Sequence, residues 1–464
     1  MAQAASPVCF DEELVSRYGG RGPRYTSYPT ALQFSESFTA DDYRRIAIAS
    51  NKVDKPLSLY LHVPFCRSLC YYCACNKVVT RNAERVQTYL RALYREIEFQ
   101  AALFERERNV RQLHFGGGTP TYLSRHELSG LMSTLHSAFS LEQGAKREFS
   151  IEVDPRSVNR ESVSMLSDLG FNRLSLGIQD FDPRVQMAVN RIQSAGDVEN
   201  LLEGARRSGF GSVSFDLMYG LPYQTVESFD DTLTTVIAMR PDRIAIYNYA
   251  HLPQRFKGQR MIDEAHIPSP QTKLRIFHNT IDRLGADGYQ YIGMDHFALP
   301  GDELVLARQN GTLQRNFQGY STHGDCELIG LGVSAIGSIG YAYSQNTTST
   351  IEYEAMLGDG RLPIRRGIQV DVDDRLRANI IQSLMCYDAL DLDAFSVRNH
   401  IDFRSYFADE LLRLQPLEQD RLIEVSDSSM RITPKGRLLL RSIAMVFDRY
   451  LAGADNEGRY SKAI

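Results

Sequence analysis

The stretch LSLYLHVPFCRSLCYYCAC, residues 57–75, contains four of the seven cysteines in this chain of 464 residues. Three residues separate Cys66 from Cys70, two separate Cys70 from Cys73, and Cys75 follows after one more. A structural zinc site usually takes two separated pairs of ligands, and no second Cys or His pair follows at that spacing. The spacing instead suits a short loop that wraps thiolates around a cubane iron–sulphur cluster. If only Cys66, Cys70 and Cys73 bind the cluster, one iron stays open for chemistry on a bound molecule.

Six strand-like runs alternate with amphipathic helical patterns, beginning in this same stretch. We expect strands at residues 57–63, 112–115, 148–153, 173–178, 212–217 and 243–248. Between the first two, Leu90, Leu93 and Ile97 recur at intervals of three and four, as on the apolar face of a surface helix. Alternating strands and helices predict an α/β fold with a parallel sheet and crossover helices.

Alternate residues of these strands differ in polarity, which indicates what the sheet encloses. Tyr60 and His62 lie opposite a row of leucines on the first strand, and Glu152, Gln179 and Asp216 lie on the polar row of later strands. Because side chains alternate faces, the apolar row packs against helices and the polar row faces a cavity. A closed eight-stranded barrel fills its interior with branched apolar residues. We therefore predict an incomplete parallel (β/α)6-type barrel around a wet cavity.

Functional residues gather at the carboxyl ends of the strands in such barrels, and the distinctive residues fall there. Cys66 follows the first strand directly, and the run GGGTP at 116–120 follows the second, where missing side chains would let the backbone approach a ligand. Glu152, Gln179 and Asp216 lie at or near the ends of the third, fourth and fifth strands. A buried carboxylate needs a partner, which a cationic ligand or an arginine would provide. Each of these polar residues would also suit a structural hydrogen bond at a strand end.

Composition and charge limit the partners. A net charge of −5 gives no basic footprint, so we expect neither nucleic acid nor an anionic membrane. Residues 1–10 lack the charged start and apolar run of a secretory signal, and no segment approaches about 18 consecutive apolar residues. Four close thiols fit a reducing compartment, so we predict a soluble cytoplasmic protein. Cys9, Cys326 and Cys386 have no partners at ligand spacing and are predicted to be structural or incidental.

The chain is long enough for one large domain and one or two smaller ones. We expect an N-terminal extension at residues 1–55, irregular around Tyr25 to Pro29, and a barrel domain at residues 56–365. Residues 366–464 are predicted to form a mostly helical C-terminal domain with two strand-like runs and a final helix beginning near Lys435. Such a pattern is typical of a winged-helix module, but the weakly acidic chain argues against DNA binding. We therefore expect a cap domain.

The motif CxxxCxxC, with Tyr72 directly before its last cysteine, resembles the signature of radical S-adenosylmethionine (SAM) enzymes. In those enzymes the amino and carboxylate groups of SAM chelate the open iron. A longer match is narrower, because CYYCACNKVVT at 70–80 and RYTSYPT at 24–30 closely resemble the family of oxygen-independent coproporphyrinogen III oxidases. The resemblance extends from Arg24 to about Leu451.

The resemblance implies a 4Fe–4S cluster on Cys66, Cys70 and Cys73, together with two SAM molecules. The SAM on the cluster would contact Tyr60, Gly117, Glu152 and Ile336, and the second SAM would contact Tyr72, Gly118, Thr119, Gln179, Arg191, Asp216 and Ala250. Cys75 fits the family pattern, either as a catalytic-site residue outside the ligand set or as a loop thiol. His62 either tunes the cluster or the substrate site, or is a satisfied core residue.

The implied activity converts coproporphyrinogen III to protoporphyrinogen IX in haem biosynthesis. A reduced cluster would cleave SAM to methionine and a 5′-deoxyadenosyl radical, which would remove a hydrogen atom from a propionate group. Loss of carbon dioxide and an electron would leave a vinyl group, and two propionates would react. Four substrate carboxylates favour arginines at the mouth of the site, with Arg24 as one candidate.

An electron donor such as flavodoxin or ferredoxin is implied as a partner, and we expect a monomer. Two rival interpretations remain open. A radical-SAM-like haem carrier would share the three cysteines but is expected to lack Cys75 and the segment at 24–30. An iron–sulphur protein that only transfers electrons would need no polar-lined barrel.

Overall fold

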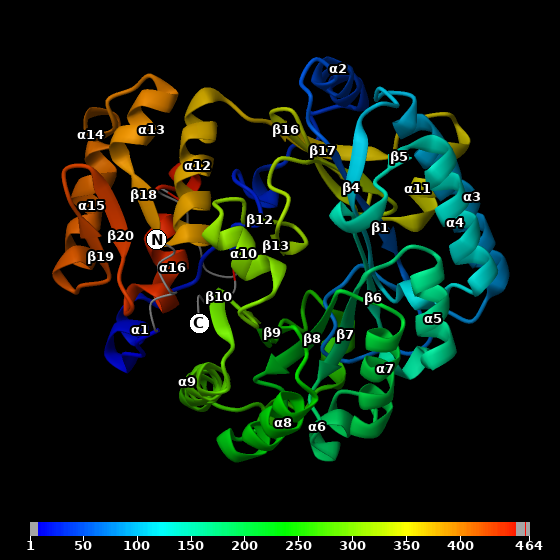
Figure 1. Cartoon of the computed structure of the whole chain (residues 1–464), viewed down its shortest axis with the longest axis horizontal. Coiled ribbons are helices and arrows are strands. Elements are labelled where there is room, and N and C mark those ends of the chain that lie inside the picture. The colour runs from blue at the N-terminus through cyan, green and yellow to red at the C-terminus, as the bar shows by residue number, and fades with distance from the viewer. Residues whose placement is uncertain (1–7, 452–459, 461–464) are drawn as a thin grey trace. The chain divides into compact units, whose positions relative to one another are not determined.

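The computed structural model describes residues 8–451 and Tyr460, which form two compact units (Figure 1). The first unit contains the described parts of Met1–Leu32, Phe277–Gly324 and Val370–Ile464, and the second contains Gln33–Ile276 and Asp325–Gln369. Residues 1–7, part of the segment predicted to lack a secretory signal, lie outside the described residues. None of the described helices is both long and apolar enough to cross a membrane. The predicted domain boundaries at residues 55 and 365 stay a prediction.

The second unit is built on a sheet that contains all six predicted strands. These are β1 (Leu57–Val63), β4 (Asn109–Gly117), β6 (Glu148–Val153), β7 (Arg173–Gln179), β8 (Ser212–Tyr219) and β9 (Arg243–Asn248). They lie in the order β9-β8-β7-β6-β4-β1, and every neighbouring pair is parallel. Within the described residues the sheet does not close on itself. The predicted incomplete parallel barrel is therefore confirmed.

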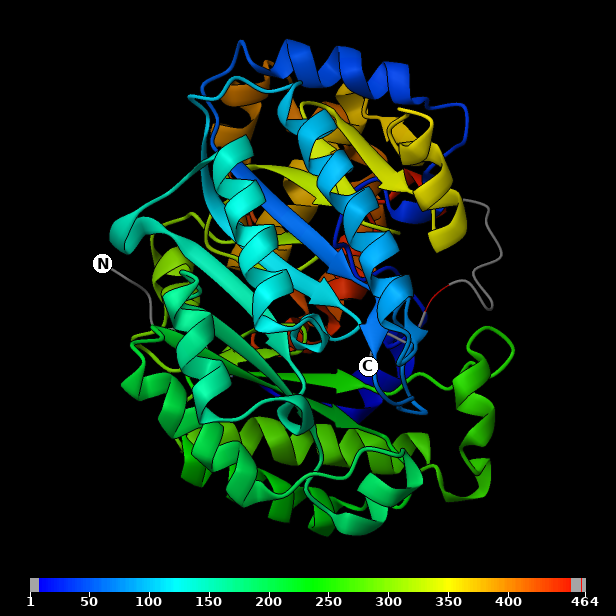
Figure 2. The same ribbon diagram turned by 90° about the vertical axis from the view of Figure 1, so that its right-hand side faces the viewer.

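Crossover helices connect these strands and cover one face of the sheet (Figure 2). They are α3 (Ala83–Ala101), α4 (Arg125–Ala138), α5 (Arg160–Asp168), α6 (Pro183–Ala188), α7 (Ala195–Arg207) and α8 (Val226–Met239). Ser124 and Thr225 begin α4 and α8 with capping boxes, which satisfy backbone N–H groups at the helix start. The predicted stripe Leu90, Leu93 and Ile97 of α3 is buried. Each such side chain contributes about 1.5–3 kcal/mol when it leaves water.

Four strands beyond β1 were not predicted. β14 (Glu327–Leu331) pairs with β1 in parallel, and β15 (Ile336–Ile339), β16 (Ala342–Asn346) and β17 (Ile364–Gln369) continue the sheet in antiparallel pairs. β14, β15 and β17 each contain a glycine, a residue that is depleted in strands, and the polar residues of β16 and β17 leave little apolar alternation to read. A Cβ at Gly330 would lie 2.7 Å from the backbone of Ile336, so this glycine lets two strands approach each other.

The N-terminal segment contains two helices that were not predicted. They are α1 (Glu12–Tyr18) and α2 (Ala40–Ser50). Thr39 and Asp42 form a capping box at the start of α2, and this pair is a local sequence signal for a helix start. The segment from Tyr25 to Pro29 is irregular, as predicted.

The C-terminal part of the first unit is mostly helical, as predicted. It contains α12 (Val372–Tyr387), α13 (Leu392–Asn399), α14 (Phe403–Tyr406), α15 (Ala408–Gln419) and α16 (Leu440–Met445), with a small sheet of β18 (Ala389–Asp391), β19 (Ile423–Val425) and β20 (Ser429–Ile432). The final helix begins later than Lys435, because a 3-10 turn at Gly436–Leu439 precedes α16. The remaining larger elements are α9 (Pro270–Ala286), α10 (Glu303–Gln309), α11 (Thr350–Gly358) and the hairpins of β10 (Gln290–Gly293) with β11 (His296–Ala298) and β12 (Gln314–Asn316) with β13 (Gly319–Ser321).

Candidate active site around the cysteine loop

The cysteine loop leaves the carboxyl end of β1 and packs on the glycine run that ends β4. Within the loop β2 (Phe65–Cys66) pairs with β3 (Val78–Val79). Gly118 N donates to Val63 O at 2.8 Å, at the point where the loop begins. A Cβ at Gly118 would lie 2.7 Å from the carbonyl group of Pro64. The glycine therefore lets the loop lie directly against the backbone that follows β4.

A cavity of about 540 Å³ lies at the carboxyl ends of β1, β4, β6, β7 and β8. It brings together most of the predicted site residues, although they are spread over 150 positions of the sequence. Those that line it are Cys66, Cys70, Tyr72, Cys73, Cys75, Gly117, Gly118, Thr119, Glu152, Gln179, Arg191 and Asp216. Tyr60, His62, Ala250 and Ile336 are not among its lining residues.

The thiols of the loop have donors and cations around them. Thr119 Oγ1 lies 3.5 Å from Cys66 Sγ, and two arginines reach Cys70 Sγ, Arg156 Nη2 at 3.3 Å and Arg191 Nη1 at 3.4 Å. Burial raises the pKa of Cys66 to about 11. A hydrogen bond from the neighbouring Cys75 thiol lowers the pKa of Cys73 to about 6, and the charge of Lys77 acts in the same direction.

These residues fit an iron–sulphur cluster. Cys66, Cys70 and Cys73 form no disulfide and line one cavity, and two arginines lie close enough to balance thiolate charge. In the described residues no three or more His, Cys, Asp or Glu side chains lie close enough to share a single metal ion. A cubane does not need such closeness, because each thiolate binds a different iron.

Asp154 joins the two arginines and was not predicted as a site residue. Its Oδ2 lies 2.7 Å from Arg156 Nη2 and 3.3 Å from Arg191 Nη1. Burial alone would raise the pKa of Asp154, but the two guanidinium groups hold it below its ordinary value. Arg191 also donates to Gly177 O from Nε at 3.2 Å and from Nη2 at 2.5 Å. Asp154 therefore fixes the direction in which both arginines face Cys70.

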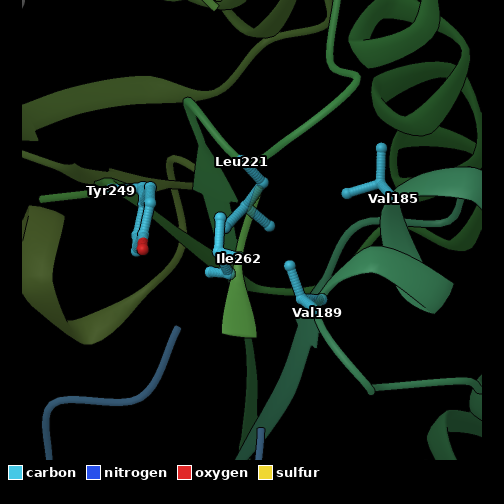
Figure 3. Packing of buried hydrophobic residues seen from close by; sticks show 5 residues of the cluster. All are labelled: Val185, Val189, Leu221, Tyr249 and Ile262. Atoms are coloured by element: carbon cyan, nitrogen blue, oxygen red, sulfur yellow. The ribbon is translucent and has the colours of Figure 1, made fainter. Parts of the chain in front are cut away.

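A small apolar cluster packs against the cysteine loop. It consists of Val185, Val189, Leu221, Tyr249 and Ile262, from α6 and its C-terminal end, the turn after β8, and the segment after β9 (Figure 3). Tyr71 and Tyr72 of the loop pack against these side chains. Tyr71 N also donates to Val189 O at 3.0 Å. Tyr72 lies between Cys70 and Cys73 and lines the cavity. The packing that holds it in place cannot be read from the sequence pattern.

Gln259 ties the cysteine loop to the segment that follows β9. Its side chain is 1% exposed, and its Nε2 donates to Tyr72 O at 3.0 Å and Ala250 O at 3.2 Å. Its Oε1 accepts from Leu252 N at 2.5 Å. The predicted residue Ala250 therefore lies next to Tyr72, joined to it through Gln259. No motif marked Gln259, because its contacts link residues far apart in the sequence.

Glu152 lies near the carboxyl end of β6, and its carboxylate has hydrogen-bond donors on both oxygens. His114 Nε2 lies 3.2 Å from Oε1, and Gly117 N donates to Oε2 at 3.1 Å. His114 Nδ1 in turn lies 2.5 Å from Ser150 Oγ, which fixes the ring. Burial alone would raise the pKa of Glu152, yet these donors hold it below its ordinary value. The carboxylate is ionised and stabilised before any ligand binds.

Asp216 in β8 is less well provided with donors. Within the described residues its one hydrogen bond comes from Ser175 Oγ to Oδ2 at 2.7 Å. Burial raises the pKa of Asp216 to about 6, and the bond from Ser175 offsets only part of this effect. On the neighbouring strand Gln179 has a φ of 70°, a left-handed conformation that costs a residue with a side chain about 1–3 kcal/mol. At this end of the polar row the carboxylate of Asp216 therefore has too few hydrogen-bond donors, and the backbone at Gln179 is strained.

His62 is buried and is not a lining residue of the cavity. It is 6% exposed, its Nε2 lies 2.8 Å from Asn76 O, and its Nδ1 lies 3.1 Å from Tyr60 Oη. Burial lowers the pKa of His62, so the ring is neutral, with Nε2 donating to Asn76 and Nδ1 accepting from Tyr60. This is the environment of a satisfied core histidine. The strict alternation predicted for β1 fails here, because Ser58 is also buried.

Tyr60 and Ile336 lie on neighbouring parts of the sheet, outside the cavity lining. Tyr60 stacks on His114 with ring centroids 5.7 Å apart. It pairs with Gly330 across β1 and β14, and Gly330 contacts the backbone of Ile336. The two predicted residues are thus brought close together, although they are far apart in the sequence.

Comparison with known proteins places this site in a family. The Radical SAM superfamily model matches residues 60–236, and the HemN C-terminal domain model matches residues 370–439. The oxygen-independent coproporphyrinogen III oxidase of Pseudomonas aeruginosa is 50% identical over 457 residues, which cover 98% of this chain and 99% of that protein. This chain belongs to the family of oxygen-independent coproporphyrinogen III oxidases. The Escherichia coli member is 47% identical over the same length, with the same coverage.

The family assignment agrees with a solved structure. Coproporphyrinogen III oxidase (HemN) from Escherichia coli, described as a radical SAM enzyme, matches with a TM-score of 0.91 and 47% identity, over 96% of this chain and 100% of that chain. Membership of the radical SAM superfamily implies a 4Fe–4S cluster and SAM as cofactors. The fold class and the family predicted from the sequence are confirmed.

Proposed function

We propose that this chain catalyses the oxygen-independent oxidative decarboxylation of coproporphyrinogen III in haem biosynthesis. Two propionate groups each lose a hydrogen atom, carbon dioxide and one electron and become vinyl groups, which gives protoporphyrinogen IX. One observation carries the proposal: a single cavity collects the CxxxCxxC thiols, the glycine run and the carboxylates of the polar row. The 50% and 47% identity to named oxidases over nearly the whole chain supports the same reaction.

Cys66, Cys70 and Cys73 are proposed to hold the cluster. When bound, the cluster and SAM supply the 5′-deoxyadenosyl radical that removes the hydrogen atom from the substrate. The protein's own part is to position and shield the reacting groups. Thr119 donates a hydrogen bond to Cys66 Sγ and Arg191 donates one to Cys70 Sγ, which would hold these two sulphur atoms in position.

Two SAM sites are proposed from the family pattern. The SAM on the cluster contacts Tyr60, Gly117, Glu152 and Ile336, and the second SAM contacts Tyr72, Gly118, Thr119, Gln179, Arg191, Asp216 and Ala250. Eight of these eleven residues line the one cavity, all but Tyr60, Ile336 and Ala250, which supports sites that lie side by side. Asp216 suits a cationic or hydrogen-bond-donating ligand group, because it has a single donor of its own.

Cys75 and His62 are proposed to act near the cluster and outside its ligand set. Cys75 lines the cavity, which supports a role in turnover. His62 is proposed as a positioning residue, because its ring holds the carbonyl of Asn76, the residue after Cys75.

The reductant is proposed to be a one-electron carrier such as flavodoxin or ferredoxin, and the enzyme is proposed to act as a monomer. The close spacing of Cys66, Cys70, Cys73 and Cys75 supports a reducing location such as the cytoplasm, because four such thiols would be at risk of forming disulfides in an oxidising one. The division into an N-terminal extension, a barrel and a helical C-terminal domain at residues 55 and 365 is proposed on the sequence pattern alone.

An anaerobic assay tests the proposed function. Protein reconstituted with iron and sulphide is incubated with dithionite, SAM and coproporphyrinogen III, and the porphyrins, 5′-deoxyadenosine and methionine are quantified. We expect protoporphyrinogen IX and one molecule each of 5′-deoxyadenosine and methionine per vinyl group formed. Tight haem binding without SAM cleavage or vinyl formation would instead identify the haem-carrier alternative.

A further inference from the structure

A second cavity of about 660 Å³ lies beside the cysteine loop and has no part in the proposed reaction. The turns after β4 and β6 and the helices α3, α4 and α5 contribute to it, together with Arg67 from the cysteine loop and Arg81 from the segment that follows the loop. Arg67, Arg81, Tyr122 and Ser157 line both this cavity and the one that contains the cysteines. The two cavities therefore share a wall, and Arg67 directly follows the proposed ligand Cys66.

Three arginines line the second cavity without a carboxylate partner. Arg67, Arg81 and Arg125 are exposed, and none of them forms an ion pair or hydrogen bond with the part of the chain that the structure describes. Arg67 lies over the ring of Tyr122, 5.3 Å from its centroid. Because an exposed guanidinium stays charged, this surface presents positive charge on a chain whose net charge is −5.

The two glutamates that line this cavity weaken its positive charge only in part. Glu127 is engaged in the capping box of α4 and accepts from Gln87 at 2.6 Å, and Glu161 lies in the first turn of α5. Carboxylates in these positions are offset by the positive ends of the helix dipoles. The arginines have no such compensation, and the three of them outnumber the two glutamates in the lining of the cavity.

We propose that this surface, formed by Arg67, Arg81 and Arg125 around the second cavity, is the docking site of the reductant. The partner is a small acidic protein that carries a flavin or an iron–sulphur group at its surface. The inference rests on the proposed function and names the partner of that site. In the transfer the carrier loses one electron and the cluster gains it, and no covalent bond changes.

Geometry and charge both favour this surface. A carrier protein is too large to enter the cysteine cavity, and the wall that the two cavities share offers a direct route to the proposed cluster ligands, because Arg67 directly follows Cys66. Tyr122 and Arg67 belong to that wall. Unpaired arginines raise the rate at which an acidic partner associates and select its orientation.

Charge reversal tests the proposal on the cluster-loaded enzyme. The variant is Arg125→Glu, because Arg67 and Arg81 also line the cavity that contains the cysteines whereas Arg125 does not. The matched control is Arg207→Glu in the last turn of α7, an exposed arginine at the opposite, amino end of the strands. Affinity for flavodoxin is measured by titration calorimetry, and the rate of cluster reduction is followed by stopped-flow absorption with reduced flavodoxin or with dithionite.

We expect Arg125→Glu to lose severalfold in flavodoxin affinity and in flavodoxin-driven reduction, and to show a weaker salt dependence. Reduction by dithionite stays unchanged, and the Arg207→Glu control behaves as the wild type in both assays. If Arg125→Glu fails to fold, Arg125→Gln should give a smaller loss in the same direction.

Unchanged flavodoxin affinity in folded variants overturns the docking proposal. Weaker SAM or coproporphyrinogen III binding with flavodoxin binding intact also overturns it, because the arginines would then serve a small molecule. A wild-type enzyme that dithionite reduces but that neither cleaves SAM nor forms vinyl groups contradicts the proposed function instead. Flavodoxin binding still reports on the docking surface in that case.

Discussion

Glu152 and Asp216 lie on the same polar row of one cavity, at the carboxyl ends of β6 and β8, but their charges are held differently. Glu152 accepts from Gly117 N and lies within hydrogen-bonding distance of His114, and its pKa is lowered. Asp216 accepts from Ser175 alone among the described residues, and burial raises its pKa to about 6. Two carboxylates that the sequence pattern could not tell apart are thus prepared for different tasks.

The difference shows which end of the cavity the protein completes by itself. A buried carboxylate with several donors is stable without a ligand, whereas one with too few donors bears a desolvation cost that a ligand can relieve. The cavity is therefore preorganised at Glu152 in β6. At Asp216 in β8 it lacks a cationic or hydrogen-bond-donating group that a ligand could provide. Variants of the cysteine loop and of each carboxylate distinguish these two ends.

The largest effect is expected for the cysteines. Replacing Cys66, Cys70 or Cys73 by Ala should abolish the cluster and all activity, because each thiolate binds a different iron. Cys75→Ser, the matched control on the same loop, should keep the cluster absorption and impair turnover. Iron, sulphide and visible absorption of anaerobically purified variants provide the measurement. Stoichiometric zinc without sulphide, or loss of the cluster in Cys75→Ser, would contradict this assignment.

Asp216→Asn should weaken SAM binding about ten- to hundredfold. The amide has nearly the same size, so iron content and folding stay intact, while a charge-assisted hydrogen bond worth about 1.5–3 kcal/mol is lost. Calorimetric titration with SAM and a thermal melt measure the two quantities side by side. A lowered melting temperature with unchanged SAM affinity would mean that Asp216 is structural and would remove the contrast with Glu152.

The polar row could be predicted because its signal is local. Period-two alternation in β6, β7 and β8 appears directly in the burial of successive side chains, with Phe149, Ile151 and Phe215 at most 2% exposed between half-buried polar neighbours. Parallel strands then bring their carboxyl ends together whatever their separation in sequence. The cavity and most of its lining residues follow from these two facts.

The rest depends on contacts that no local pattern encodes. Gln259 donates to Tyr72 across 187 positions, and Asp154 orients Arg191 across 37. Alternation placed His62 on the polar row that faces the cavity. In the structure its ring instead forms a hydrogen bond with the carbonyl of Asn76, the residue after Cys75. Such long-range hydrogen bonds become visible only when the loops are placed on the sheet.

SAM affinity should depend on pH through Asp216. A pKa raised from 3.8 to about 6 means that the folded protein holds this proton more tightly than the unfolded chain. Stability is therefore lost as pH rises from 3.8 towards 6, and a ligand that needs the ionised form must displace the proton below about pH 6. We expect affinity to fall by up to about tenfold per pH unit below that point. Asp216→Asn should remove this slope, and a wild-type affinity that is flat between pH 5 and pH 7 would contradict the prediction.

Glu152→Gln should give the smallest change, and mainly in stability. The new amide has one acceptor oxygen for the donor Gly117 N, and its NH₂ group then faces His114 Nε2. Two donors facing each other would cost about 1–3 kcal/mol. The cost should lie near the lower end, about 1 kcal/mol, because His114 can adopt its other tautomer and donate from Nδ1 to Ser150 instead.

The pH dependence of this loss distinguishes it from a packing defect. Because the pKa of Glu152 is lowered by folding, its stabilisation is present above the ordinary value of 4.5 and disappears as pH falls through the folded value. The difference in free energy of unfolding between wild type and Glu152→Gln should therefore shrink in acid, as urea titrations at a series of pH values can measure. SAM affinity should fall less than in Asp216→Asn, because the protein already provides donors for this carboxylate. If Glu152→Gln instead loses more SAM affinity than stability, the β6 end also depends on its ligand, and the contrast between the two carboxylates is wrong.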